Sequence, residues 1–160
     1  GVLFTALDLK GRRKFGAKII PNRGVWIEIE TDKDDTIYAR IDKKRKFPVT
    51  SLLRVMGLDT DDKIRKAFKG NPEHEKIVNM MLEKDHSKTV EEAYVDIYKR
   101  LRDGDMATAD NAKEFVDGLI TLDRYAFSKV GRHRFSQSFE PPMEKSMRKP
   151  TTSTTSDDAV

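Results

Sequence analysis

The chain has 160 residues, 37% of them hydrophobic and 36% charged, with no cysteine and a net charge of +4 at pH 7. The lack of cysteine excludes a disulfide framework and a cysteine-ligated zinc site, and no apolar run is long enough to span a bilayer. This length is enough for the core of one domain, and the mild positive charge favours nucleic-acid binding only weakly.

The first third of the chain has the pattern of short strands. Residues 2–8, 14–20, 25–30 and 36–42 are rich in β-branched and aromatic side chains, and glycine, asparagine or aspartate separates them. We expect these segments to form a mixed or antiparallel sheet.

The third of these segments alternates between its two faces. One face carries three apolar residues, Val25, Ile27 and Ile29. Trp26, the only tryptophan, falls on the opposite face together with two glutamates. We therefore expect Trp26 to point toward solvent or a partner, although a lone tryptophan in a strand more often belongs to a core.

From Pro48 onward the apolar period becomes helical. Pro48 suits the first position of a short helix that ends before Gly57, and residues 60–68 favour another. Three later helices are expected to begin at residues whose side-chain oxygen can act as an N-cap: Asn71, Thr89 and Thr108. The strongest amphipathic stripe follows the second of these: Val90, Ala93, Tyr94, Ile97 and Leu101.

Strands followed by helices predict an α+β domain, a sheet from the N-terminal third packed with several short helices. We place this domain at residues 1–139. Residues 140–160 are rich in serine, threonine and charge, so they are interpreted as a polar flexible tail or linker. Because the chain begins at Gly1 without methionine, we expect it to be a piece of a longer polypeptide.

Charge is segregated along the chain. Five cations and one acid lie between Arg40 and Lys46, and four cations, a histidine and no acid lie between Arg124 and Arg134. Five acids and one lysine lie between Glu28 and Asp35. Patches of both signs are therefore expected. Arg54 and Arg65, on expected helices, are interpreted as ordinary surface charge.

Motifs for catalysis are missing from the sequence. It contains neither G-x-x-x-x-G-K-[ST] nor G-x-G-x-x-G, and no G-x-S-x-G frames a serine. None of the three histidines is followed by a metal-ligand residue three or four positions later. Asp32, Asp34 and Asp35 fit turn chemistry better than a magnesium site. We expect no catalytic residue and no cofactor in this chain.

Three blocks of sequence identify a family. Residues 18–57, KIIPNRGVWIEIETDKDDTIYARIDKKRKFPVTSLLRVMG, resemble the lobe region of the bacterial RNA polymerase β subunit. The pattern there is R/K-I-I-P-x-R-G-x-W-[IL]-x-[FI]-E, then [FY]-x-R-I-D-[RK]-[RK]-R-K-x-P, then L-L-R-[AV]-x-G. Residues 91–119 resemble its I-Y-x-[RK]-[LM]-R-P-G-[ED]-P-P-T-x-[ED]-[NA]-A block, and residues 124–139 its R-Y-D-L-S-x-V-G-R-x-[KR]-[FI]-N block. One departure is that Arg-Pro-Gly-Glu-Pro-Pro becomes RDGDMA at residues 102–107, which bears on the rigidity of that loop.

The resemblance implies the lobe of the β subunit of DNA-directed RNA polymerase, a nucleotidyltransferase whose catalytic Mg²⁺ is held by the β′ subunit. It implies a wall of the DNA cleft, where Trp26 stacks on a base of the non-template strand. The basic residues implied to line the path of downstream DNA are Lys43, Lys44, Arg45, Arg102 and Arg132. The implied partners are DNA, the β′, α and ω subunits, sigma and other transcription factors, with no membrane. The implied location is the bacterial cytoplasm, at the nucleoid.

Elementary physics is compatible with these roles. An exposed ring can stack on any base, which contributes ~1–3 kcal/mol, and cations neutralise phosphates without reading sequence. Other interpretations stay open: a solvated face for at least one or two of residues 43–46, and a capping or bracing role for Arg132. The alternative function is a protein-docking module for sigma or another transcription factor, with the acids from Glu28 to Asp35 as its docking face.

Overall fold

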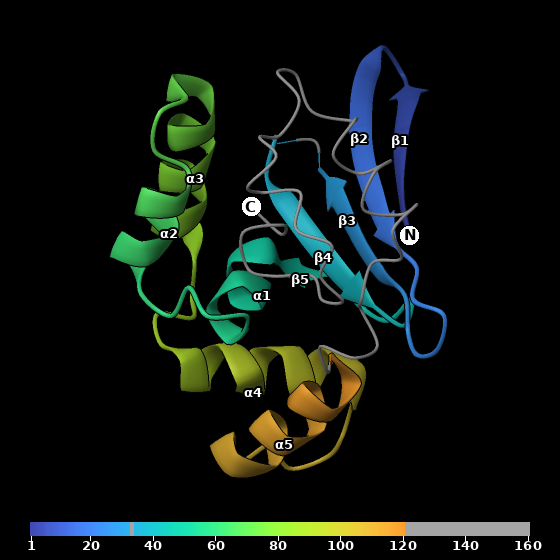
Figure 1. Cartoon of the computed structure of the whole chain (residues 1–160), viewed down its shortest axis with the longest axis vertical. Coiled ribbons are helices and arrows are strands. Elements are labelled where there is room, and N and C mark those ends of the chain that lie inside the picture. The colour runs from blue at the N-terminus through green and yellow to red at the C-terminus, as the bar shows by residue number, and fades with distance from the viewer. Residues whose placement is uncertain (33, 121–160) are drawn as a thin grey trace.

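The computed structural model describes residues 1–32 and 34–120 of the chain. The N-terminal part is a five-stranded sheet in which each strand pairs antiparallel with the next along the chain (Figure 1). Its strands are β1 (Val2–Leu9), β2 (Arg12–Ile19), β3 (Ile27–Thr31), β4 (Ile37–Ile41) and β5 (Phe47–Pro48). The expected α+β class is confirmed, with a wholly antiparallel sheet. The two-residue strand β5 was not expected from the sequence.

The pairing of β3 with β4 places their apolar residues opposite each other on one face of the sheet. Ile27 lies opposite Ile41 and Ile29 opposite Ala39. Ile27, Ala39 and Ile41 are buried in the main core, and Val25 and Ile29 pack against it. The alternation predicted for this segment is therefore confirmed, because a strand with one apolar face can hold only one register against a core.

Within the residues that the structure describes, five helices follow the sheet. They are α1 (Val49–Val55), α2 (Asp61–Ala67), α3 (Pro72–Lys84), α4 (Val90–Leu101) and α5 (Ala109–Leu119). The three N-caps expected from sequence are confirmed, since the side chains of Asn71, Thr89 and Thr108 accept hydrogen bonds from backbone N–H groups of the first helical turn.

The expected start of the first helix is wrong by one residue. Pro48 belongs to β5, opposite Tyr38, with an extended ψ of 138°, and α1 begins at the next residue. The expected end is confirmed. Gly57 has a φ of +121° and donates to Arg54 O at 3.3 Å, while Leu58 N donates to Leu53 O at 3.0 Å. These two bonds cap the last carbonyls of α1.

The helices pack at the β4–β5 end of the sheet (Figure 1). Helix α4 lies against α1 and β5, and α5 lies against α4, where the rings of Tyr98 and Phe115 meet edge to face at 5.4 Å. Helices α2 and α3 form a hairpin on the far side from β1 (Figure 1). A second, smaller core attaches it to α1: Leu53, Ile64, Val78 and Leu82.

The interpretation of Arg54 as surface charge is wrong. Its side chain is fully buried, and Nη1 donates to Asp59 O at 3.1 Å and to Lys88 O at 3.3 Å. Nη2 donates to Asp85 Oδ2 at 3.2 Å and also to Asp61. A buried cation is tolerated only when it is paired and hydrogen-bonded, and these acceptors serve Nη1 and Nη2, while the buried Nε has no hydrogen-bond partner among the described residues. Arg65, by contrast, is exposed on α2 as expected.

Two expectations fall outside the described residues. These are the domain boundary after residue 139 with its polar tail, and the basic stretch 124–134 that contains Arg132. Within residues 1–32 and 34–120, none of the helices combines the length and the apolar character that crossing a bilayer requires.

Candidate nucleic-acid interface

Trp26 lies just before β3 and presents an exposed ring. Trp26 is 37% exposed, as expected from its place in the alternating pattern of the strand. Its backbone carbonyl accepts from Asp42 N at 3.0 Å, which continues the pairing of β3 with β4 by one step. The backbone at Trp26 is thus held by the sheet, while more than a third of the residue is exposed to solvent.

The turn after β4 places a lysine over this ring. Asp42 and Lys43 both have a φ of +56°, in the left-handed region, and Lys44 N donates to Ile41 O at 3.2 Å to close the turn. Residues other than glycine seldom adopt this backbone conformation, and residues that do adopt it cluster at functional sites. The result brings Lys43 Nζ to 5.3 Å from the centre of the Trp26 ring, a cation–π contact.

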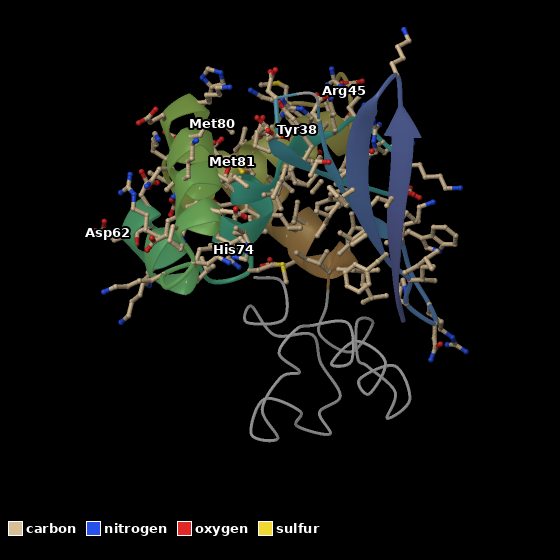
Figure 2. The ribbon with its side chains drawn as sticks, turned by 90° about the horizontal axis from the view of Figure 1, so that it is seen from above. Tyr38, Arg45, Asp62, His74, Met80 and Met81 are labelled. Carbon is tan, nitrogen blue, oxygen red and sulfur yellow. The ribbon has the colours of Figure 1, made fainter. Side chains whose placement is uncertain are left out.

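Next to this pair lies a shallow groove of about 410 Å³ between the β4–β5 loop and the end of α4. Five cations, one aliphatic residue and one acid line it: Arg40, Lys43, Lys44, Arg45, Arg100, Leu101 and Asp103. A concave surface lined mainly by one sign of charge raises the local potential and attracts polyanions. Figure 2 shows Arg45 on this side of the molecule, far from Asp62 and His74 on the α2–α3 hairpin.

Several of these cations are already engaged. Arg45 Nη2 donates to Asp103 Oδ1 at 2.6 Å and to Lys99 O at 3.2 Å. Arg40 Nε donates to Glu30 Oε1 at 3.1 Å, and its Nη1 to Lys44 O at 3.1 Å, which fixes the loop. Arg100 pairs with Asp96 one turn earlier on α4. Lys43 and Lys44 have no carboxylate partner among the described residues, so they are the cations most available to phosphate.

The other cations expected at this surface do not line the groove or are not described. Arg102 is not part of the groove lining: its Nε donates to Asp105 Oδ2 at 2.8 Å and its guanidinium lies 5.3 Å from the Phe115 ring centre. Lys46, beside the groove residues in sequence, pairs with Asp32 at 2.7 Å and lies 4.5 Å from the Tyr38 ring centre. Arg132 falls outside the described residues.

Neither Arg40 nor Arg100 was predicted from the sequence as a site residue, although both line the groove. Arg40 opens the same cationic run as Lys43, which was the available signal. Arg100 lies on α4 more than fifty residues later, and only the packing of α4 against β5 brings it to the groove.

The acids proposed as an alternative docking face are partly neutralised. Glu30 pairs with Arg40 and Asp32 with Lys46.

In the part of the chain that the structure describes, no three histidine, aspartate or glutamate side chains gather closely enough to hold a metal ion.

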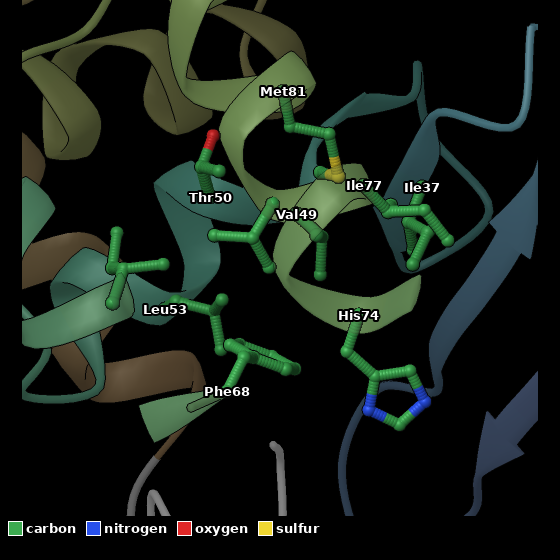
Figure 3. Close-up of a pocket in the computed structure, with 10 residues that line it drawn as sticks. Ile37, Val49, Thr50, Leu53, Phe68, His74, Ile77 and Met81 are labelled. Carbon is green, nitrogen blue, oxygen red and sulfur yellow. The ribbon is translucent and has the colours of Figure 1, made fainter. Parts of the chain in front are cut away.

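A second hollow, of about 190 Å³, lies between β4, α1 and the α2–α3 hairpin (Figure 3). Its lining is almost wholly apolar, with Ile37, Leu53 and Phe68 among its residues and His74 as an exposed member. The hydroxyl of Thr50, another lining residue, is buried and has no hydrogen-bond partner among the described residues. This lining has no cation to attract phosphate, so the basic groove and Trp26 form the candidate interface.

Comparison with known proteins agrees with the sequence blocks. The family model described as RNA polymerase Rpb2, domain 2, matches residues 3–149. The chain is similar to the protein named DNA-directed RNA polymerase subunit beta from Clostridium perfringens (strain 13 / Type A), with 46% identity over 132 residues. The protein of the same name from Clostridium kluyveri (strain NBRC 12016) is 45% identical over 133 residues. Each alignment covers 82% of this chain and 10% of the relative, so the chain spans about a tenth of the length of these relatives.

Proposed function

Because this chain belongs to the RNA polymerase Rpb2 domain 2 family, the lobe of the β subunit, we propose that it forms one wall of the DNA cleft of a bacterial DNA-directed RNA polymerase. It serves nucleotidyl transfer by holding DNA, and the catalytic Mg²⁺ belongs to another subunit. DNA and the β′, α and ω subunits are its partners within the enzyme, and sigma and other transcription factors bind it transiently. The enzyme acts in the bacterial cytoplasm.

One observation carries the DNA-contact role, namely the exposed Trp26 ring with Lys43 5.3 Å from its centre, beside a groove lined by five cations. The ring offers a surface on which an unpaired base of the non-template strand stacks, whatever its identity. The lysines of the groove neutralise the phosphates on either side of that base. Such a surface holds DNA without reading it, which suits an enzyme through which every sequence must pass.

The test measures the binding of the 160-residue chain to a fluorescein-labelled duplex that contains an unpaired stretch in one strand. We expect the affinity to fall steeply with salt, with a slope of about −0.9 in log K against log salt for each phosphate neutralised. Lys44→Ala should reduce both the affinity and this slope, and Trp26→Ala should reduce the preference for the unpaired stretch over a full duplex.

Lys66→Ala is the matched control, because this lysine is exposed on α2, away from the groove. Equal effects of Lys44→Ala and Lys66→Ala, or binding that does not respond to salt, would contradict the proposal. Salt-insensitive binding of a transcription factor to this face would favour the docking alternative.

A further inference from the structure

We propose that Asp103 is a built-in competitor for DNA phosphate: its carboxylate holds the guanidinium of Arg45 across the basic groove and thereby weakens the grip of the groove on a nucleic-acid backbone. This inference rests on the proposed DNA-contact function and adds a residue that tunes it. It concerns an acid inside a surface that is otherwise cationic.

The geometry of the contact spans the groove. Arg45 comes from the β4–β5 loop and Asp103 from the residues just after α4, 58 positions later, and both line the groove. The distance from Arg45 Nη2 to Asp103 Oδ1 is 2.6 Å, and the same nitrogen lies 3.2 Å from Lys99 O. The ion pair therefore joins a residue of the β4–β5 loop to a residue at the end of α4, the two segments between which the groove lies.

The ion pair between Arg45 and Asp103 is weak enough to be broken by a competing anion. Its two side chains are 62% and 71% exposed, so water screens their attraction and the bond contributes little stability. The buried Arg54–Asp85 pair is the opposite case, because its side chains are 0% and 1% exposed. A phosphate that enters the groove can replace Asp103 as the acceptor of Arg45, since a guanidinium binds phosphate and carboxylate with the same planar set of donors.

Anchoring the loop does not require Asp103. The carbonyl of Lys99 is in the last turn of α4, where carbonyl groups have no partner within the helix, and Arg45 donates to it independently of the carboxylate. Arg40 also fixes the loop through Lys44 O. If the pair were only a brace, loss of the carboxylate would lower stability and leave DNA affinity unchanged.

The physical consequence is a weaker hold on the DNA. A phosphate must displace the carboxylate of Asp103 and then remain near its negative charge, and both costs reduce the affinity. Moderate affinity favours movement, because differences in affinity at one interface appear mainly in the dissociation rate. We infer that Asp103 keeps this part of the DNA path weak enough for DNA to pass.

The experiment compares four variants of the 160-residue chain on the same labelled duplex at low salt: Asp103→Asn, Asp62→Asn, Arg45→Ala and Arg45→Ala with Asp103→Asn. Asp62→Asn is the matched control, because it also removes one negative charge and its side chain is 97% exposed on α2, on the opposite side of the molecule from Arg45 (Figure 2). Thermal unfolding of each variant verifies that the fold is retained.

We expect Asp103→Asn to bind DNA about two- to five-fold more tightly than the parent, the range that one exposed ion pair supports. Asp62→Asn should change the affinity by less. In the Arg45→Ala background, the gain from Asp103→Asn should fall to about that of Asp62→Asn, because the cation that Asp103 restrains is gone.

Two results would overturn the inference: Asp103→Asn binding no more tightly than Asp62→Asn, or a gain that persists in full without Arg45. If Lys44→Ala still weakens binding in those cases, the DNA-contact function stands and only the role of Asp103 fails. If neither Lys44→Ala nor salt affects binding, the proposed function itself fails, and this inference with it.

Discussion

Arg54 Nη2 lies 3.2 Å from Asp85 Oδ2, and the two side chains are 0% and 1% exposed. The pair joins α1 to the residue that ends α3, and the same guanidinium nitrogen also donates to Asp61 at the start of α2. One cation therefore connects three helices around the smaller core. Removing either partner of such a pair leaves an uncompensated buried charge.

Arg54→Ala should lower the free energy of unfolding by about 3–5 kcal/mol, because it leaves Asp85 buried without its cation. Urea unfolding followed by circular dichroism measures this change. Arg65→Ala is the control: that side chain is exposed on α2 and its removal should cost less than about 0.5 kcal/mol. Similar losses for the two variants would show that Arg54 does not hold the helices together.

Asp61 should make the fold sensitive to acid. Burial acts to raise the pKa of its carboxyl, but the hydrogen bond and charge of Arg54, with Lys88, bring the pKa below its ordinary value of 3.8. A carboxyl with a lowered pKa in the folded state stabilises the fold above its unfolded-state pKa, and this contribution is lost as the pH falls through the folded-state pKa. Stability should therefore decline below about pH 4.

Urea unfolding of the parent and of Asp61→Asn at pH 7 and at pH 3 tests this linkage. The variant should be less stable than the parent at pH 7, and the difference should shrink at pH 3, which is below the ordinary pKa of 3.8 at which the Asp61 carboxyl of the unfolded chain binds a proton. A difference that is the same at both pH values would mean that Asp61 does not contribute through its charge.

Trp26→Ala should affect stability far less than the loss of a core aromatic residue. Trp26 is 37% exposed, whereas Phe47 on β5 is fully buried. Phe47→Ala should cost about 3–5 kcal/mol and Trp26→Ala well under half of that. Because the chain has one tryptophan, its fluorescence reports this site alone. Emission that iodide cannot quench, with a large loss of stability in Trp26→Ala, would place the ring in the core.

Thr50→Val should leave the fold as stable as before or stabilise it by up to about 1 kcal/mol. The Thr50 hydroxyl is buried beside the apolar hollow and has no hydrogen-bond partner within residues 1–32 and 34–120, and a methyl group of similar shape has no need of one. Thr50→Ser, which keeps the hydroxyl and loses the methyl, should destabilise. A clear loss in Thr50→Val, measured by urea unfolding, would reveal a partner for the hydroxyl.

Local patterns account for what could be predicted of the fold. The N-caps Asn71, Thr89 and Thr108 act on the turn that follows them, so a few adjacent residues decide them. The face of Trp26 follows from the two-residue period of a strand, and its exposure agrees with that phase. The strand β5 could not be predicted, because two residues are too few to show an alternating pattern and only the pairing with β4 defines the strand.

The candidate site was predicted in part. The cationic run with Lys43, Lys44 and Arg45 is adjacent in sequence, and all three residues line one groove. Arg102 was expected to share that surface, but its side chain turns to Asp105 and the Phe115 ring, contacts that a charge count does not reveal. The buried role of Arg54 was missed although the L-L-R-[AV]-x-G pattern of the family carries an arginine at this position.

The sequence by itself determined the order of the four longer strands and of helices α1 to α5, the caps Asn71, Thr89 and Thr108, the exposed phase of Trp26 and the membership of a family, because each depends on neighbouring residues or on a pattern of letters. Only the tertiary structure decided which distant charges meet. Asp85 comes to Arg54 across 31 residues, and Asp103 to Arg45 across 58. Pairs of this kind depend on how the helices pack, and no local period records them. The same packing decides whether a cation is buried as part of the fold or left at the surface for a phosphate.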